Sequence, residues 1–136
     1  KEGKDPRAKV GGMRFDSYEE LIACRELYDN NRFVSHINKI ELVKGDFLKT
    51  CTSYLEKNQH LIIALLYLDF DLYEPTKHAL KNFIPRMPKG SVIAFDEVNH
   101  PDWPGETLAV IEELGINSLR IERFEFDSMR SYAVIN

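Results

Sequence analysis

The sequence has only two cysteines in 136 residues, and it has no long apolar run. Cys24 and Cys51 form no CxxC or other metal-ligand spacing, which argues against a zinc site. No apolar stretch approaches the roughly 20 residues that cross a bilayer, and no signal peptide is recognisable. The formal net charge is −4, so the sequence has no excess of basic residues, which nucleic-acid binding requires. These absences predict a cytoplasmic protein whose partners are neither membranes nor nucleic acids.

The composition is that of an ordinary globular domain. Hydrophobic residues make up 43% of the sequence and charged residues 29%, and the length suits one domain with a buried core. Residues 1–16 are charged and contain glycine and proline, so we expect a loop or a disordered arm there. Residues 17–136 are predicted to form a single α/β domain.

Hydrophobic patterning predicts helices that alternate with strands. Ser17 and Glu20 form a capping box, which predicts a helix that runs to about Asn30. The unbroken apolar run 61–68 is typical of a strand in a parallel sheet that is covered on both faces. Further strands are predicted at 39–44, 91–95, 119–126 and 132–135, and further helices at 47–55, 74–84 and 107–114. This alternation predicts a doubly wound α/β sheet with helices on both faces and an antiparallel last strand.

Acidic side chains follow two of the predicted strands. Asp69 and Asp71 come after the run 61–68, and Asp96 and Glu97 follow the strand 91–95. Ligands bind beyond the carboxyl ends of parallel strands, and converging carboxylates repel one another unless a cation lies between them. We therefore predict that Asp69, Asp96 and Glu97 hold a magnesium-sized cation, and that Asp69 also acts in catalysis. The alternative is that these acids are solvated or cap helices, which is the favoured role for Asp71.

Three other positions have a possible functional role beside a structural one. Asp46, between Gly45 and Phe47, could accept a hydrogen bond from an adenine amino group or cap the helix that follows. His100 could act as a general base near neutral pH, although a surface histidine without a chemical role is the commoner outcome. Trp103 could wall a substrate pocket or only pin its loop to the sheet.

Three segments, in this order, carry a resemblance to a known family: LVKGDFLKT, LLYLDFDLYEPTKHAL and KGSVIAFDEVNHPDWPGETLAVIEE. Together they are similar to the S-adenosylmethionine-dependent sugar O-methyltransferases of the macrocin O-methyltransferase and cephalosporin hydroxylase-like family, over about residues 39–115. The resemblance implies a Rossmann-like methyltransferase sheet with the strand order 3-2-1-4-5-7-6. It also implies S-adenosylmethionine and Mg²⁺ as cofactors, and methyl transfer to a hydroxyl of a sugar or another small molecule.

The resemblance also implies roles for single residues. Asp69 matches the acid that ends family strand 4, and Asp96 and Glu97 match the pair that ends family strand 5; together these acids form the family's metal site. Asp46, within the candidate cofactor-binding segment 45–47, matches the acidic position near the adenine. The metal would hold two sugar hydroxyls, lower the pKa of one and aim it at the methyl group.

Two features of the family are missing from this sequence. Gly11-Gly12 follows no predicted strand, so it is not the glycine-rich loop after strand 1, and the acid that ends strand 2 is also missing. The sequence therefore resembles the distal part of a methyltransferase without its first two strands, and we expect poor cofactor binding and no turnover. The free edge of strand 61–68 is predicted to pair with strand 39–44 or to join copies of the chain into a homo-oligomer.

Other functions stay open from the residues alone. LDFDLYEPT has the hydrophobic-strand DxD form of haloacid dehalogenase-like phosphatases, although Tyr73 stands where such enzymes usually carry Thr or Val. A DxD glycosyltransferase that binds a nucleotide-sugar through manganese is a second alternative. A methyltransferase-like domain could also act only as a non-catalytic interaction module.

Overall fold

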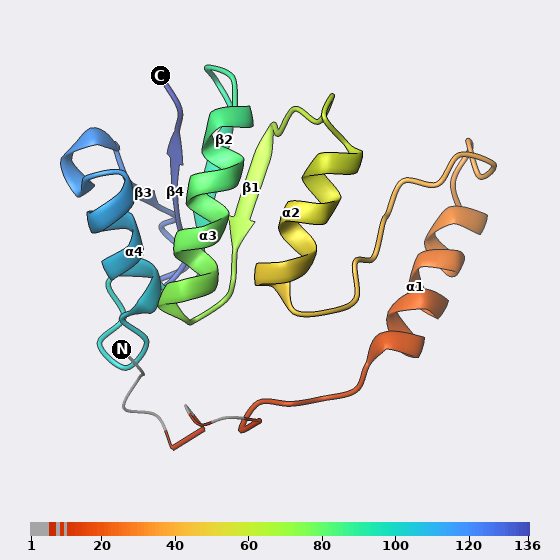
Figure 1. Cartoon of the computed structure of the whole chain (residues 1–136), viewed down its shortest axis with the longest axis horizontal. Coiled ribbons are helices and arrows are strands. Elements are labelled where there is room, and N and C mark those ends of the chain that lie inside the picture. The colour runs from red at the N-terminus through yellow and green to blue at the C-terminus, as the bar shows by residue number, and fades with distance from the viewer. Residues whose placement is uncertain (1–5, 8, 10) are drawn as a thin grey trace.

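The computed structural model describes residues 6–7, 9 and 11–136, in which helices and strands alternate (Figure 1). Parts of the predicted arm, residues 1–5, 8 and 10, lie outside the described residues. In chain order the elements are α1 (Tyr18–Asn30), α2 (Phe47–Lys57), β1 (Leu65–Leu68), α3 (Tyr73–Phe83), η1 (Ile84–Arg86), β2 (Val92–Phe95), α4 (Gly105–Glu113), η2 (Ile116–Ser118), β3 (Glu122–Arg123) and β4 (Ser131–Val134).

The strands form one sheet in the order β1-β2-β4-β3. β1 and β2 are parallel, with Leu66 opposite Ile93 and Leu68 opposite Phe95. β4 is antiparallel to both of its neighbours, β2 and β3. This arrangement confirms the predicted fold class, and it corresponds to the 4-5-7-6 part of the sheet order that the resemblance implies.

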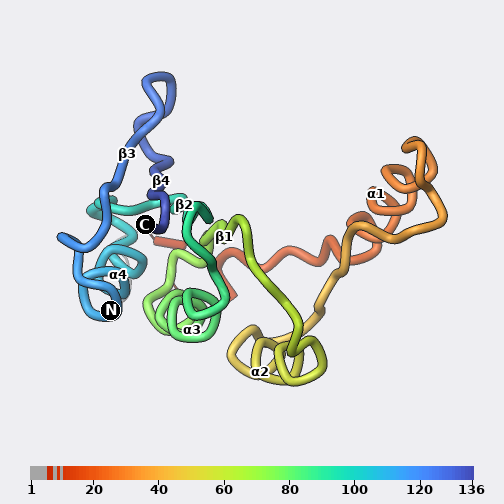
Figure 2. Tube along the Cα trace, turned by 90° about the horizontal axis from the view of Figure 1, so that it is seen from above, coloured from red at the N-terminus to blue at the C-terminus, as the bar shows by residue number. Residues whose placement is uncertain are grey.

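The helices α2, α3 and α4 lie side by side on the same face of the sheet (Figure 2). Alternate strand residues face them, so that Leu68 and Phe95 join Leu80 of α3 in the hydrophobic core. The prediction placed helices on both faces, whereas these three share one. On the other face, which we call the open face, Leu65 and Val134 are 62% and 42% exposed.

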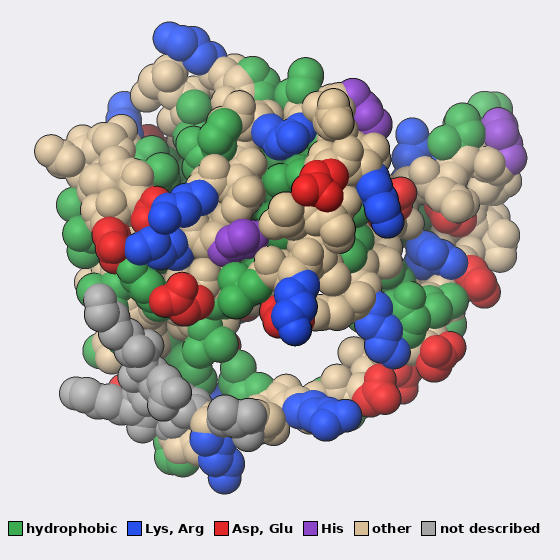
Figure 3. Space-filling model, in the orientation of Figure 1, with side chains coloured by type: hydrophobic (Ala, Val, Ile, Leu, Met, Phe, Trp, Pro, Cys, Tyr) green, Lys and Arg blue, Asp and Glu red, His purple; other side chains and the backbone are tan. Residues whose placement is uncertain are grey.

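The outer surface of the helix layer is polar. Lysine, arginine, aspartate and glutamate side chains are scattered over it (Figure 3). Lys77 of α3 reaches across to α4, where its Nζ lies 2.8 Å from Glu112 Oε1 and 3.3 Å from Glu113 Oε1. The helix layer therefore buries one side against the sheet and exposes the other to solvent.

The predicted strand at 39–44 is not formed. This segment is irregular and lies beyond α2 as seen from β1 (Figure 1). Within the sheet of the described residues, β1 pairs with β2 and not with this segment, so the first of the two alternatives for the free edge, pairing with 39–44, is wrong. A strand needs a neighbour for its backbone hydrogen bonds, and the strands that the resemblance places between these two are missing from this sequence.

Several smaller predictions also differ from the structure. Ser17 precedes α1 but makes no side-chain capping bond, because its backbone does not adopt the extended conformation of a helix cap. The strand expected over 119–126 is reduced to Glu122–Arg123. In the part of the chain that the structure describes, no helix is long and apolar enough to cross a membrane. The predicted cytoplasmic location is not tested by this finding.

Candidate functional site

The carboxyl ends of β1 and β2 are neighbours, as the site prediction required. In their parallel register Leu68 lies opposite Phe95, so Asp69 and Asp96 form the next pair along. The backbone N–H of Asp96 donates to the Leu68 carbonyl at 3.0 Å, which extends the pairing to the point where the acids begin. Both acids therefore lie at one edge of the sheet.

Asp96 is the centre of a hydrogen-bonded group that we call the open-face group: Tyr67, Asp96 and Arg130. Asp96 Oδ1 accepts from the Tyr67 hydroxyl at 2.5 Å and from Arg130 Nε at 2.8 Å. Asp96 itself is only 7% exposed. Its carboxylate is thus buried with a guanidinium as its counter-charge, which is the condition under which a buried charge is tolerated.

The strand register explains why Arg130 meets Asp96. In the antiparallel pairing of β2 with β4, Ser131 lies opposite Phe95, so the preceding Arg130 lies opposite Asp96. Tyr67 reaches the same carboxylate from β1, because it lies on the open face between Leu66 and Leu68, which point to the core. Three neighbouring strands therefore each contribute one side chain.

Asp69 lies beside this group and is exposed. Partial burial and the charge of Asp96 raise the pKa of Asp69, and Arg130 opposes the shift. Within the described residues its carboxylate has no hydrogen bond or ion pair. It is therefore the acid at this edge that is available to a ligand.

A second group of acids meets the start of α4, and we call Glu97 and Glu106 the α4-side pair. The Glu97 N–H donates to Glu106 Oε2 at 2.9 Å, and Glu106 is fully buried. Burial raises the pKa of Glu106 to about 8; the Glu97 N–H bond opposes this shift and nearby carboxylates add to it. Burial and the charge of Asp71 raise the pKa of Glu97 to about 6. Glu106 is therefore mostly protonated at neutral pH.

Sequence reasoning missed Glu106, because the stretch before residue 107 was interpreted as a loop. Gly105 brings α4 close to β1, since a Cβ at this position would lie 2.4 Å from the Asp71 carbonyl oxygen. Trp103 is buried, as expected if it pins the loop to the sheet. The Trp-Pro-Gly-Glu run was the available signal for an earlier helix start.

Asp71 was expected to cap the helix that follows it. It has a φ of 57°, and no side chain caps α3.

The predicted magnesium site is not formed by this arrangement. No three His, Cys, Asp or Glu side chains of residues 6–7, 9 and 11–136 are grouped so that they could hold a metal ion. Asp96 is engaged by Tyr67 and Arg130, while the Glu97 carboxyl shares a hydrogen bond with the Asp71 side chain. The carboxylates therefore do not fit the metal that the resemblance implies.

His100 lies close to these acids. It is half-buried and lines a cavity of about 200 Å³ with Glu97, Arg123 and Met129 among others. Its Nδ1 accepts from the Asp102 N–H at 3.2 Å, so the neutral imidazole carries its proton on Nε2. In this tautomer His100 presents a hydrogen-bond donor at Nε2, and its role as a general base stays a prediction.

The candidate cofactor-binding segment 45–47 leads into α2. Gly45 has a φ of +143°, and Asp46 caps the helix by accepting from the Leu48 N–H at 3.1 Å. The Phe47 ring packs on Phe70 with the centroids 4.6 Å apart. Gly45 and Phe47 also line a cavity of about 300 Å³. The structure shows the capping role of Asp46, and its contact with an adenine stays a prediction.

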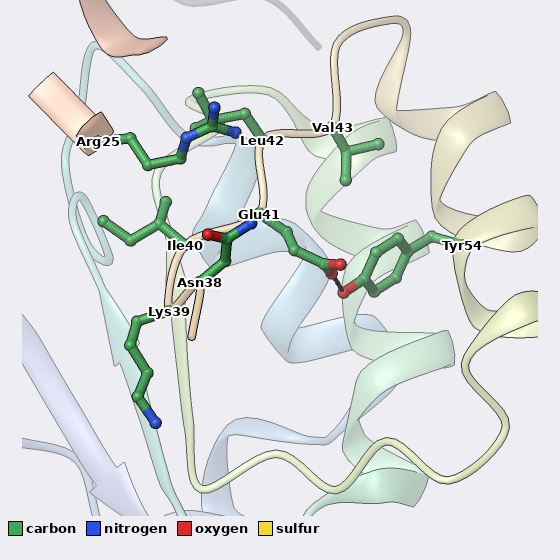
Figure 4. A pocket seen from close by; sticks show the side chains of 8 residues that line it. All are labelled: Arg25, Asn38, Lys39, Ile40, Glu41, Leu42, Val43 and Tyr54. Carbon is green, nitrogen blue, oxygen red and sulfur yellow. Dashed lines mark hydrogen bonds between the residues drawn. The ribbon is translucent and has the colours of Figure 1, made fainter. Parts of the chain in front are cut away.

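A larger cavity, of about 560 Å³, lies among α1, α2 and the irregular segment before α2 (Figure 4). The Tyr54 hydroxyl donates to the Glu41 carboxylate and ties this segment to α2. None of the acids that follow β1 and β2 lines this cavity. The lining residues are Arg25, Asn38, Lys39, Ile40, Glu41, Leu42, Val43 and Tyr54.

No protein-family model and no curated protein matches this sequence. Among solved structures, the apo structure of CalS11, a TDP-rhamnose 3'-O-methyltransferase of calicheamicin biosynthesis, is 35% identical, covers 85% of this chain and 50% of its own, and has a TM-score of 0.82. A second CalS11 crystal structure is 33% identical over 96% of this chain and 52% of its own, with a TM-score of 0.89. The O-methyltransferase NovP, 22% identical over 99% of this chain and 57% of its own, has a TM-score of 0.55 and shares the fold.

The chain spans about half the length of these structures. Its fold is that of part of a sugar O-methyltransferase, which confirms the predicted resemblance at the level of the fold.

Proposed function

We propose that these residues belong to an enzyme that transfers a methyl group from S-adenosylmethionine to a sugar hydroxyl. The observation that carries the proposal is the edge formed by β1 and β2, where exposed Asp69 lies beside Asp96, in a chain with the fold of CalS11. A nucleotide-linked sugar is the acceptor class that this neighbour suggests.

The segment 45–47 has features that suit the cofactor. Gly45 has no side chain beside the cavity that it lines, and the Asp46 carboxylate is 53% exposed, which leaves acceptor capacity for an amino group. When bound, the cofactor supplies a methyl group on a sulfonium. The glycine-rich loop and the acid after strand 2 are missing from this sequence, so we propose that the 136 residues alone bind the cofactor poorly and do not turn over.

Asp69 is the candidate base. Asp69 would accept the proton of the sugar hydroxyl that receives the methyl group. The exposure and the raised pKa of Asp69 suit this role, whereas Asp96 is buried and hydrogen-bonded to Arg130. His100, with its proton on Nε2, would donate a hydrogen bond to the sugar that receives the methyl group. Magnesium dependence is not part of the proposal, because the carboxylates do not fit a metal.

Calorimetric titration of S-adenosylhomocysteine tests the proposal. We expect binding to a chain extended upstream to the length of its structural relatives, and little binding to the 136 residues alone. No binding to the extended chain would contradict a methyltransferase. Phosphate release from a generic phosphoester would then favour the phosphatase, and its absence would favour an interaction module.

Two substitutions in the extended protein test the assigned roles. We expect Asp69→Asn to lower kcat by about 10²-fold or more and to leave S-adenosylhomocysteine binding unchanged. His100→Gln keeps a donor and should have a smaller effect, and Glu125→Gln, at an exposed glutamate of the β3–β4 turn, serves as the control. A kcat for Asp69→Asn equal to that of the control would contradict the role of Asp69.

We also propose that copies of this chain assemble through β1. β1 is the end strand of the sheet that the described residues form, and its first residue, Leu65, is exposed. Unpaired strand edges with apolar flanks promote pairing with another chain. Analytical ultracentrifugation should show a homo-oligomer, and a monodisperse monomer would contradict this part of the proposal.

A further inference from the structure

A divalent cation was expected at the acids that follow β1 and β2. The positive charge beside these acids is instead that of an arginine side chain. Arg130 Nε lies 2.8 Å from Asp96 Oδ1. The charge of Arg130 also opposes the rise in the pKa of the neighbouring Asp69 that burial and Asp96 cause. The guanidinium therefore acts on both acids of the open face.

Two features of the structure place Arg130 beside Asp96. The first is the antiparallel register, which sets Arg130 opposite Asp96. The second is the turn before β4, in which Asp127 Oδ1 accepts from the N–H groups of Met129 at 2.9 Å and Arg130 at 3.2 Å. The backbone of Arg130 is thus held both by the register of β4 and by the Asp127 carboxylate, and this places the start of its side chain beside Asp96.

The same contact opposes a metal ion. Tyr67 and Arg130 both donate to Asp96 Oδ1, so this oxygen already has two partners. A magnesium-like ion binds carboxylate oxygens at about 2.0–2.1 Å, and a guanidinium at hydrogen-bond distance from the same carboxylate repels it. A cation could therefore coordinate both oxygens of the Asp96 carboxylate only after Arg130 moves away from Oδ1.

We propose that Arg130 is the resident counter-cation of Asp96 and keeps divalent ions from this edge of the sheet. Arg130 is then a positioning residue: it holds Asp96 toward Tyr67 and leaves Asp69 as the accessible acid. The inference does not depend on methyl transfer, because it concerns the affinity of the chain for a metal ion alone.

Titration with Mn²⁺, followed by water-proton relaxation, tests the proposal on the full chain. We expect Arg130→Gln to bind Mn²⁺ about tenfold or more tightly than the unaltered chain, because the repelling charge is gone. Asp96→Asn added to Arg130→Gln should abolish the gain. The matched control is Arg123→Gln, another arginine beside the β3–β4 turn, whose guanidinium donates to the carbonyls of Val98 and Ser128.

An unchanged Mn²⁺ affinity in Arg130→Gln would overturn the proposal, as would an equal gain in Arg123→Gln. A second measurement needs no variant and so does not depend on the folding of Arg130→Gln. In the unaltered chain, added Mn²⁺ should not selectively broaden the amide resonances of Asp69, Asp96 and Glu97. Selective broadening of these resonances would show an ion bound there and would also overturn the proposal.

Discussion

Two groups of acids lie at the same edge of the sheet, and they differ in how their charge is neutralised. In the open-face group, Asp96 is paired with the guanidinium of Arg130. In the α4-side pair, Glu106 is fully buried beside Glu97, and its raised pKa lets it keep a proton instead. The difference follows from what surrounds each group. Arg130, at the start of β4, lies next to Asp96, whereas the start of α4 buries Glu106.

The α4-side pair is expected to make the stability of the fold depend on pH. A carboxyl whose pKa is raised by folding stabilises the fold while protonated, and this stability is lost as the pH rises from its unfolded pKa to its folded pKa. For Glu106 that window runs from 4.5 to about 8, and for Glu97 from 4.5 to about 6.

The largest expected effect is that of Glu106 on the free energy of unfolding. Between pH 4.5 and about 8 this free energy should fall by roughly 3–5 kcal/mol, because the unfolded chain releases the proton first. Glu106→Gln, which cannot ionise, should remove most of this slope in urea unfolding at several pH values. Exposed Glu125→Gln is the control, and a slope unchanged by Glu106→Gln would contradict the assignment.

The next effect concerns the ion pair. Arg130→Met leaves Asp96 buried without its counter-charge, and we expect a loss of about 1–2 kcal/mol at neutral pH, moderated because the Arg130 side chain is 44% exposed. Asp96→Asn in the Arg130→Met background should recover part of the loss. Urea unfolding of the single and double variants measures the coupling, and additive losses would show that the two residues do not interact.

Removal of the Tyr67 hydroxyl should have a smaller effect. Tyr67→Phe deletes one hydrogen bond to a buried carboxylate, and we expect a loss of about 1 kcal/mol in thermal or urea unfolding. Tyr132→Phe is the matched control, because its hydroxyl donates to the less buried Glu122 at 3.0 Å. A larger loss in the control than in Tyr67→Phe would contradict the role given to Tyr67.

The smallest effect has the opposite sign. Asp69→Asn removes a negative charge beside Asp96, so it should stabilise the fold at neutral pH by up to about 0.5 kcal/mol. The gain should vanish in acid, where Asp69 is protonated in both states. A destabilisation at neutral pH would mean that Asp69 has a favourable partner in the folded chain.

The sequence predicted the core of this site better than its surroundings. The apolar runs before Asp69 and Asp96 identified the strands β1 and β2, and their parallel pairing brought these acids together as expected. Arg130 could not be predicted, because its position depends on the register of β4 and on the turn before it. Glu106 was missed because α4 begins two residues earlier than its hydrophobic pattern indicated, where Gly105 packs on the Asp71 backbone.

The irregular segment 39–44 shows a different kind of limit. Its local pattern fits a strand, but a strand exists only with a paired neighbour, and the sheet formed by the described residues supplies none at that position. Patterns that are read within a short window predict α3 and β2 well. They cannot report whether a distant partner is present.

The central claim is that Asp96 is held by Arg130 and not by a metal ion. The measurement that tests it most directly is the ¹⁵N–¹H resonance of Arg130 Nε, assigned by comparison with Arg130→Lys. The account predicts a resolved, slowly exchanging Nε–H signal that collapses to the position of free arginine in Asp96→Asn and stays unchanged when Mg²⁺ is added. A signal already at that position in the unaltered chain, or one that moves there with Mg²⁺, would contradict the account.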